Sequence, residues 1–192
     1  MRIPKRMKQR PQWRGMAIPY IATIRDDGTP DFRVTDHVKR FEVMKWQMCQ
    51  LCGQPLGRWC FFVGGPVSAE QNAYFEPACH LDCLMYAMQV CPFIVGTKPE
   101  HADLEAVRKA NPDRTVLIDD TYVATNTETW VIVKANGWGY TQTKGGTIMI
   151  VPHVVKRSQV LRPKEMKPAD WNQLTKELSS HDNTMQVNVH TA

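Results

Sequence analysis

The chain has 192 residues, 43% of them apolar and 22% charged, which is typical of one soluble globular domain or of one domain with a small appended module. No apolar run approaches the roughly 18–20 residues needed to span a bilayer, and the amino-terminal stretch MRIPKRMKQRPQWRG lacks the apolar segment of a secretory signal. We therefore expect a cytoplasmic protein. In a reducing compartment, cysteines that all lie between Cys49 and Cys91 favour a metal site over disulfides.

The net charge of +5 is distributed unevenly along the chain. Residues 1–48 contain 11 basic residues (Lys and Arg) and 5 acidic ones (Asp and Glu). Residues 49–130 contain 5 basic and 10 acidic residues, and residues 131–192 contain 8 basic and 4 acidic residues. Basic ends indicate a polyanionic partner such as nucleic acid, because each cation near a phosphate can release a condensed counterion. The other interpretation is that these charges form solvated faces and a loose arm.

The first part of the chain predicts a basic, flexible arm over residues 1–15, with Trp13 as its anchor. A β-hairpin and a helix follow over residues 16–48. The hairpin is indicated by DDGTP between two β-prone runs, and Asp36 is a good N-cap for a helix over about residues 37–47. On that helix Val38, Phe41 and Met44 give a partly apolar face, extended by Lys45 and Trp46.

From Cys49 onward the pattern changes to a tight knuckle, CQLCGQPLG, followed by the apolar strand RWCFFVGGP and a polar turn. Residues 74–76, YFE, are predicted to be a short return strand that completes a hairpin. After Pro77, the segment ACHLDCLMYAMQVC has apolar residues at helical spacing. The predicted order is knuckle, hairpin and helix.

The remainder, residues 96–180, is predicted to be an α+β region with β-hairpins, followed by a disordered tail over residues 181–192. Its predicted helices cover about residues 100–110 and 171–179, the second capped by Asp170. Three segments resemble β-strands, namely TVLIDDTYVAT, ETWVIVKANGWGYTQT and GTIMIVPHVV, with hairpin turns at Asn136-Gly137 and Gly145-Gly146.

The two Cys/His pairs predict one metal site with the ligands Cys49, Cys52, His80 and Cys83. In a Cys-x-x-Cys turn the two sulfurs can converge on one ion, and residues three apart in the first turn of a helix share a face. A set in which Cys79 replaces His80 remains open, as does a group of buried thiols with an incidental histidine. Cys60 and Cys91 are most simply core residues.

Knuckle, hairpin and a helix with ligands in its first turn resemble a treble-clef zinc finger, over residues 49–95 or the narrower 49–91. The resemblance implies one structural zinc ion, because four protein ligands leave no position for a water molecule. Nucleases of the HNH type resemble this topology, but they place a catalytic histidine on the first strand of the hairpin, where RWCFFVGG has no His, Asp or Glu. The order and spacing also depart from zinc deaminases. We therefore expect no enzymatic activity, and an HNH-like nuclease or another metal-dependent hydrolase is the less favoured alternative.

The expected fold class is α+β: a treble-clef finger inserted in, or packed on, a small antiparallel β-sheet domain with about three or four helices. The wider pattern, with an IPYI strand, CxLCG, FVGGP, the His-x-x-Cys helix and a CPF ending, resembles small uncharacterised zinc-binding proteins of actinobacteria and bacteriophages. This resemblance implies a bacterial or phage-infected cytoplasm and brings no assigned activity.

The predicted function is to organise a surface that binds nucleic acid or an acidic protein partner. The alternative is a protein-interaction factor, such as a phage inhibitor of a host enzyme that uses the acidic middle of the chain. The residues expected to contact nucleic acid are Arg2, Lys5, Arg6, Lys8, Arg10 and Arg14 on the arm, and Lys156, Arg157, Arg162, Lys164 and Lys167 in a second patch. Trp13, Trp138 and Tyr140 are candidates for stacking on bases.

Overall fold

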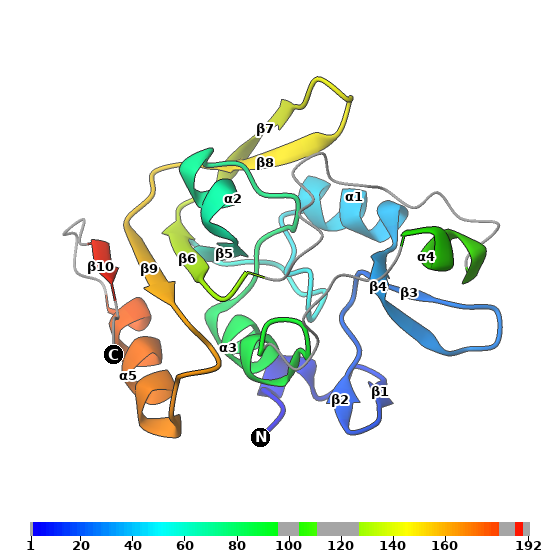
Figure 1. Ribbon diagram of the computed structural model, residues 1–192, viewed down its shortest axis with the longest axis horizontal. Helices are drawn as coiled ribbons and strands as arrows, with labels where there is room; N and C mark the ends of the chain where they lie inside the picture. The colour runs from blue at the N-terminus through cyan, green and yellow to red at the C-terminus, as the bar shows by residue number, and fades with distance from the viewer. Residues whose placement is uncertain (1, 96–103, 111–126, 181–186, 190–192) are drawn as a thin grey trace.

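The computed structural model describes residues 2–95, 104–110, 127–180 and 187–189, and contains a four-stranded sheet that extends from β5 near the middle of the view to β10 at its left edge (Figure 1). The strand order is β10-β9-β6-β5. Their bounds are Cys60–Gly64 for β5, Trp130–Ala135 for β6, Arg157–Leu161 for β9 and Val187–Val189 for β10. The central strand β6 is antiparallel to both β5 and β9, and β10 runs parallel to β9.

The two faces of this sheet build two separate parts of the core, as the two-residue period of a strand requires. From β6, Trp130 and Ile132 pack on α3 (Leu81–Val90) and α5 (Pro168–Ser179). Val131 and Val133 point the other way, toward β8 (Ile148–Pro152). Cys49, Cys52 and Cys83 belong to the first cluster, so the predicted ligands lie inside the main core.

Smaller two-stranded sheets surround the centre. They pair β1 (Gln12–Trp13) with β2 (Met16–Ala17), β3 (Ala22–Ile24) with β4 (Pro30–Thr35), and β7 (Trp138–Gln142) with β8. The predicted turns at DDGTP and Gly145-Gly146 are confirmed, and Gly28 has a φ of +79°. The Asn136-Gly137 hairpin is wrong, because both edges of β6 are already paired with β5 and β9.

Five α-helices lie within the described residues, against the three or four expected. Besides α3 and α5 they are α1 (His37–Lys45), α2 (Pro66–Glu70) and α4 (Leu104–Ala110). Asp36 caps α1 as predicted, accepting the backbone N–H of Val38 at 3.0 Å. Helix α5 begins earlier than predicted, with Lys167 at the N-cap, so Asp170 instead accepts the Lys167 N–H at 2.7 Å.

The amino-terminal segment is packed on the domain, contrary to the expected loose arm. It contains the short 3₁₀ helix η1 (Lys5–Met7) and β1. Met7 is buried in the cluster that contains the predicted metal ligands, and the Tyr86 hydroxyl accepts the N–H of Ala17 at 3.1 Å. Apolar contacts therefore fix a segment that its charges alone suggest is detached.

Two further expectations differ from the structure, and a third is not tested by it. Residues 74–76 form no return strand; β5 pairs with β6, and its contact with the later segment is a single antiparallel bridge between Phe61 and Cys79. The expected disordered tail contributes β10. The predicted strand at residues 115–125 lies outside the described residues. None of the helices in the described parts of the chain has the length and apolar character needed to cross a bilayer.

Candidate metal centre

One imidazole and three thiols converge at the junction of the knuckle and α3. The ligand atoms of Cys49, Cys52, His80 and Cys83 all lie within 4.8 Å of one another, and all four residues are buried. Tetrahedral zinc with Zn–S bonds of about 2.3 Å places its sulfurs about 3.8 Å apart. The spacing of the four atoms therefore suits a single ion with little rearrangement, and the group could hold one metal ion.

The knuckle conformation is set by its own backbone. The Cys49 N–H donates to the Gln54 carbonyl, and the Gly53 N–H donates to the Cys49 carbonyl, both at 2.8 Å. Gly53 has a φ of +74°, a region that side chains disfavour. An added Cβ at this position would also lie 2.5 Å from the Tyr20 ring. Glycine is thus required twice, for the turn and for the close approach of Tyr20.

His80 is held in the orientation that a metal ligand needs. Its Nδ1 lies 3.4 Å from Cys52 Sγ, and its Nε2 lies 3.0 Å from the Pro55 carbonyl oxygen. A carbonyl only accepts hydrogen bonds, so Nε2 carries a proton, and Nδ1 is the nitrogen that faces the sulfurs and can bind a metal. A backbone carbonyl behind a ligating histidine is a usual means of fixing the tautomer.

Cys79 neighbours the group but lies outside the four converging atoms. Its backbone bridges Phe61 on β5, and its Sγ accepts from Gln50 Nε2 at 3.4 Å. The backbone N–H of His80, by contrast, donates to Cys49 Sγ at 3.4 Å. Of the two ligand sets that the sequence left open, the geometry therefore favours the one that contains His80.

The thiols of the cluster differ in how readily they lose their protons. Burial opposes ionisation of Cys49, but hydrogen bonds from Cys52, Cys79, Cys83 and His80 outweigh it and lower the pKa of Cys49. Hydrogen bonding to Cys49 and Cys52, followed by burial, raises the pKa of Cys83 well above its usual range. The cluster alone thus supports one thiolate more readily than several. A bound divalent cation would offset the mutual repulsion of several thiolates, and coordination to a metal deprotonates thiols outright.

Of the other two cysteines, Cys60 is a core residue as predicted, whereas Cys91 is only partly buried and lies outside both core clusters. Cys60 on β5 is buried and lies 3.4 Å from the Ala135 carbonyl oxygen. Burial raises the pKa of Cys60 to about 11. Cys91 is half-buried at the carboxyl end of α3. Cys60 is thus kept as a neutral thiol, not a metal ligand.

The predicted nucleic-acid contacts in the amino-terminal segment are mostly at the surface. Arg2, Lys5, Arg6, Lys8 and Arg14 are exposed, whereas Arg10 is half-buried and donates from Nε to the Ile18 carbonyl at 3.1 Å. A shallow hollow of about 520 Å³ is lined by Arg2, Ile3, Pro4, Lys5, Lys8 and Gln9. Arg6 lies 3.6 Å from Asp82 on α3, and the Gln54 side chain of the knuckle donates to the Arg6 carbonyl at 3.2 Å. The segment is therefore attached to the candidate metal centre.

The second predicted patch is less uniform. Lys164 and Lys167 are exposed, Lys156 is half-buried, and Arg162 lies 3.7 Å from Glu165. The side chain of Arg157 is outside the described set. Met166 from this region packs on the same core cluster as Ile3 and Met7 from the amino-terminal segment, so both basic segments border one part of the core.

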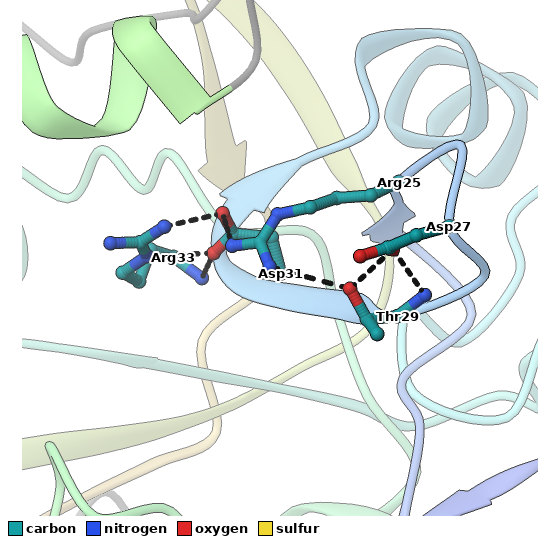
Figure 2. A network of polar contacts seen from close by, with 5 residues as sticks. All are labelled: Arg25, Asp27, Thr29, Asp31 and Arg33. Carbon is teal, nitrogen blue, oxygen red and sulfur yellow. Dashed lines mark hydrogen bonds and ion pairs between the residues drawn. The ribbon is translucent and has the colours of Figure 1, made fainter.

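Two other cations of the basic first part are already paired. Figure 2 shows Arg25 and Arg33 on either side of Asp31, in the hairpin of β3 and β4. Each guanidinium reaches Asp31 Oδ2 at 2.6 Å, and the hydrogen bond to Asp31 raises the pKa of Arg33. Thr29 closes the turn through Asp27 Oδ1 at 2.6 Å. This network stabilises the hairpin, and the charge of Asp31 offsets part of the positive charge counted in residues 1–48.

The acidic middle of the chain is only partly described. Half of the ten acids counted there lie outside the described residues, namely Glu100, Asp103, Asp113, Asp119 and Asp120.

The three aromatic residues predicted to stack on bases differ in exposure. Tyr140 and Trp13 are exposed, whereas Trp138 packs edge-on against Phe62 with ring centroids 6.0 Å apart.

Compared with known proteins, the chain matches no protein-family model, no curated protein and no solved structure.

Proposed function

We propose that this protein is a non-enzymatic nucleic-acid-binding protein whose fold is organised by one structural zinc ion. Three sulfurs and one nitrogen are ligands that select zinc over magnesium or calcium, which prefer oxygen. The four buried donors are the full number that a tetrahedral structural site uses. In this proposal the zinc ion holds the knuckle to α3, and the chemistry of recognition takes place elsewhere.

The observation that carries the proposal is the attachment of the basic amino-terminal segment to the metal module, by which we mean the knuckle, β5 and α3 with the four candidate ligands. Residues 1–15 contain six Lys and Arg and no acid. Met7 anchors this segment in the core cluster that contains Cys49, Cys52 and Cys83. The Gln54 side chain donates to the Arg6 carbonyl, and the Arg10 guanidinium lies 5.2 Å from the centre of the Tyr20 ring. Exposed cations held on a folded scaffold lose little entropy when they meet phosphates.

Binding should be measured by fluorescence anisotropy with labelled single-stranded and duplex oligonucleotides over a range of salt concentrations. We expect affinity to fall as salt rises, because phosphate contacts release counterions. The triple variant Arg2→Ala, Lys5→Ala and Lys8→Ala empties the hollow of cations, and it should lower the salt slope by about one for each phosphate that is no longer neutralised. Lys176→Ala, on the exposed side of α5, is the matched control and should bind like the wild type.

Two results would refute the proposal. One is an absence of binding to every oligonucleotide at low salt by a zinc-loaded, folded protein. The other is binding that ignores salt, or that the triple variant and the control weaken equally.

A further inference from the structure

Helix α1 buries some of its apolar residues but turns others, including its aromatic side chain, toward solvent. Val38, Phe41 and the C-cap residue Trp46 are 64%, 61% and 62% exposed. The residues that α1 buries are Arg40, Val43 and Met44. This is not the apolar face that the sequence predicted, since of that set only Met44 faces the core. Phe41 and Trp46 therefore leave most of their ring surface in contact with solvent, which points to a role in binding.

Arg40 explains why α1 has this orientation. Its guanidinium donates to the Phe75 carbonyl at 2.8 and 3.1 Å and to the Ile148 carbonyl at 2.8 Å, and it lies 4.2 Å from the centre of the Phe75 ring. These partners come from segments far along the chain, and they fix Arg40 on the inner side. Phe41, the next residue, is thereby directed outward.

The hairpin of β7 and β8 extends this surface. The Tyr140 hydroxyl donates to the Met44 carbonyl at 2.8 Å, and Arg40 joins α1 to β8 at Ile148. Tyr140 is 53% exposed and Ile148 is 43% exposed. Figure 1 shows α1 beside β8, in agreement with these bonds. We name as the aromatic face the residues Val38, Phe41, Trp46, Tyr140 and Ile148.

Positive charge accompanies the aromatic face. The Lys45 ammonium lies 5.0 Å from the centre of the Trp46 ring. Residues 138–152, which form the β7–β8 hairpin, contain Lys144 and no acid. The one acid within α1, Glu42, accepts a hydrogen bond from the Tyr20 hydroxyl at 2.8 Å. A partner that suits this surface must therefore offer flat apolar groups together with negative charge.

The aromatic face is also linked to the basic amino-terminal segment. Tyr20 lies between the two, with the Arg10 guanidinium 5.2 Å and the Lys39 ammonium 5.9 Å from the centre of its ring. Lys39 belongs to α1 and Arg10 to the amino-terminal segment. Tyr20 thus joins the two surfaces through a cation from each, with Asp36 3.8 Å from Lys39 and Glu42 at the Tyr20 hydroxyl offsetting part of that charge.

From these observations we infer that the aromatic face binds single-stranded nucleic acid, with unpaired bases stacked on Phe41, Trp46 and Tyr140. This inference rests on the proposed function and narrows its substrate class. Duplex bases present only their edges, whereas a single strand offers base faces to exposed rings and phosphates to the nearby lysines. A purely apolar protein partner would leave Lys45 and Lys144 without complementary charge.

The test compares a labelled oligothymidylate of about twelve nucleotides with a duplex of equal length. Phe41→Ala and Trp46→Ala should each weaken binding to the single strand by about fivefold or more, with an unchanged salt slope, because each removes stacking and no phosphate contact. Binding to the duplex should change less than twofold. Val154→Ala, which truncates another exposed apolar residue, is the control.

The possible outcomes distinguish failure of the inference from failure of the proposed function. Single-strand binding that the aromatic variants leave intact overturns the inference and leaves the proposed function standing. Loss of all binding in the wild type overturns both. Sedimentation in which the wild type is a dimer and Phe41→Ala is a monomer would show that a second copy covers the face, which also overturns the inference.

Discussion

Replacing Gly53 with alanine tests whether the metal knuckle is built against Tyr20. A non-glycine residue at a φ of +74° costs about 1–2 kcal/mol, partly offset by about 0.4–1 kcal/mol from a less flexible unfolded chain. The new Cβ would lie 2.5 Å from Tyr20 Cδ2, so the ring must move. Leaving its rotamer and losing the bond to Glu42 at 2.8 Å cost about 0.5–1.5 kcal/mol each.

These contributions sum to an expected decrease in the free energy of unfolding of about 1–4.5 kcal/mol, centred on about 3 kcal/mol, measured by urea denaturation of the metal-loaded protein. Gly28→Ala is the matched control, because Gly28 has a φ of +79° but no atom within 4 Å of an added Cβ. It should cost at most about 1.5 kcal/mol. In a Tyr20→Ala background, Gly53→Ala should cost no more than Gly28→Ala. Equal losses for the two alanine variants in the wild-type background would refute the packing argument.

Other perturbations test the rest of the structure. Chelation should unfold the region around Cys49 and release one metal ion, since a structural zinc site contributes on the order of 10 kcal/mol; an unchanged circular dichroism spectrum after complete metal removal would contradict this. Arg40→Met removes three hydrogen bonds to two carbonyls and should lower the free energy of unfolding, measured in urea, by about 2–4 kcal/mol. The exposed control Lys45→Met should change that free energy by no more than about 0.5 kcal/mol. Lys134 is buried and donates to the Leu178 and Ser180 carbonyls at 2.8 and 2.7 Å at the end of α5. Lys134→Met should cost about 1–3 kcal/mol, and a loss no larger than that of Lys176→Met would show that this cap is unimportant.

The four residues that converge in the candidate metal centre could be predicted because their signal is local. Cys49 and Cys52 share one turn, while His80 and Cys83 share the start of one helix, so short spacings define each pair. Asp36 and Gly28 are predictable for the same reason, since caps and tight turns depend on neighbouring residues. The choice between His80 and Cys79 needed the structure, because only the bridge to Phe61 shows where the Cys79 backbone is directed.

The strand pairing and the orientation of α1 could not be predicted in the same way. Asn136-Gly137 is a good hairpin signal, yet β6 pairs with strands from two distant parts of the chain. Nothing local to α1 announces that Arg40 will be buried, because its acceptors come from residues 75 and 148. Likewise Met7 is one apolar residue among charges, and only the cluster that receives it explains why the segment is packed.

The pairing of β5 with β6 also has a consequence for the order of folding. All four ligands lie between residues 49 and 83, so during synthesis the metal module can close before β6, at residues 130–135, leaves the ribosome. Until then β5 has one edge without its partner strand, and an open strand edge invites association with other chains. We expect early metal capture to limit that hazard, because an ordered module has fewer ways to misassemble while it waits for the second half of its sheet.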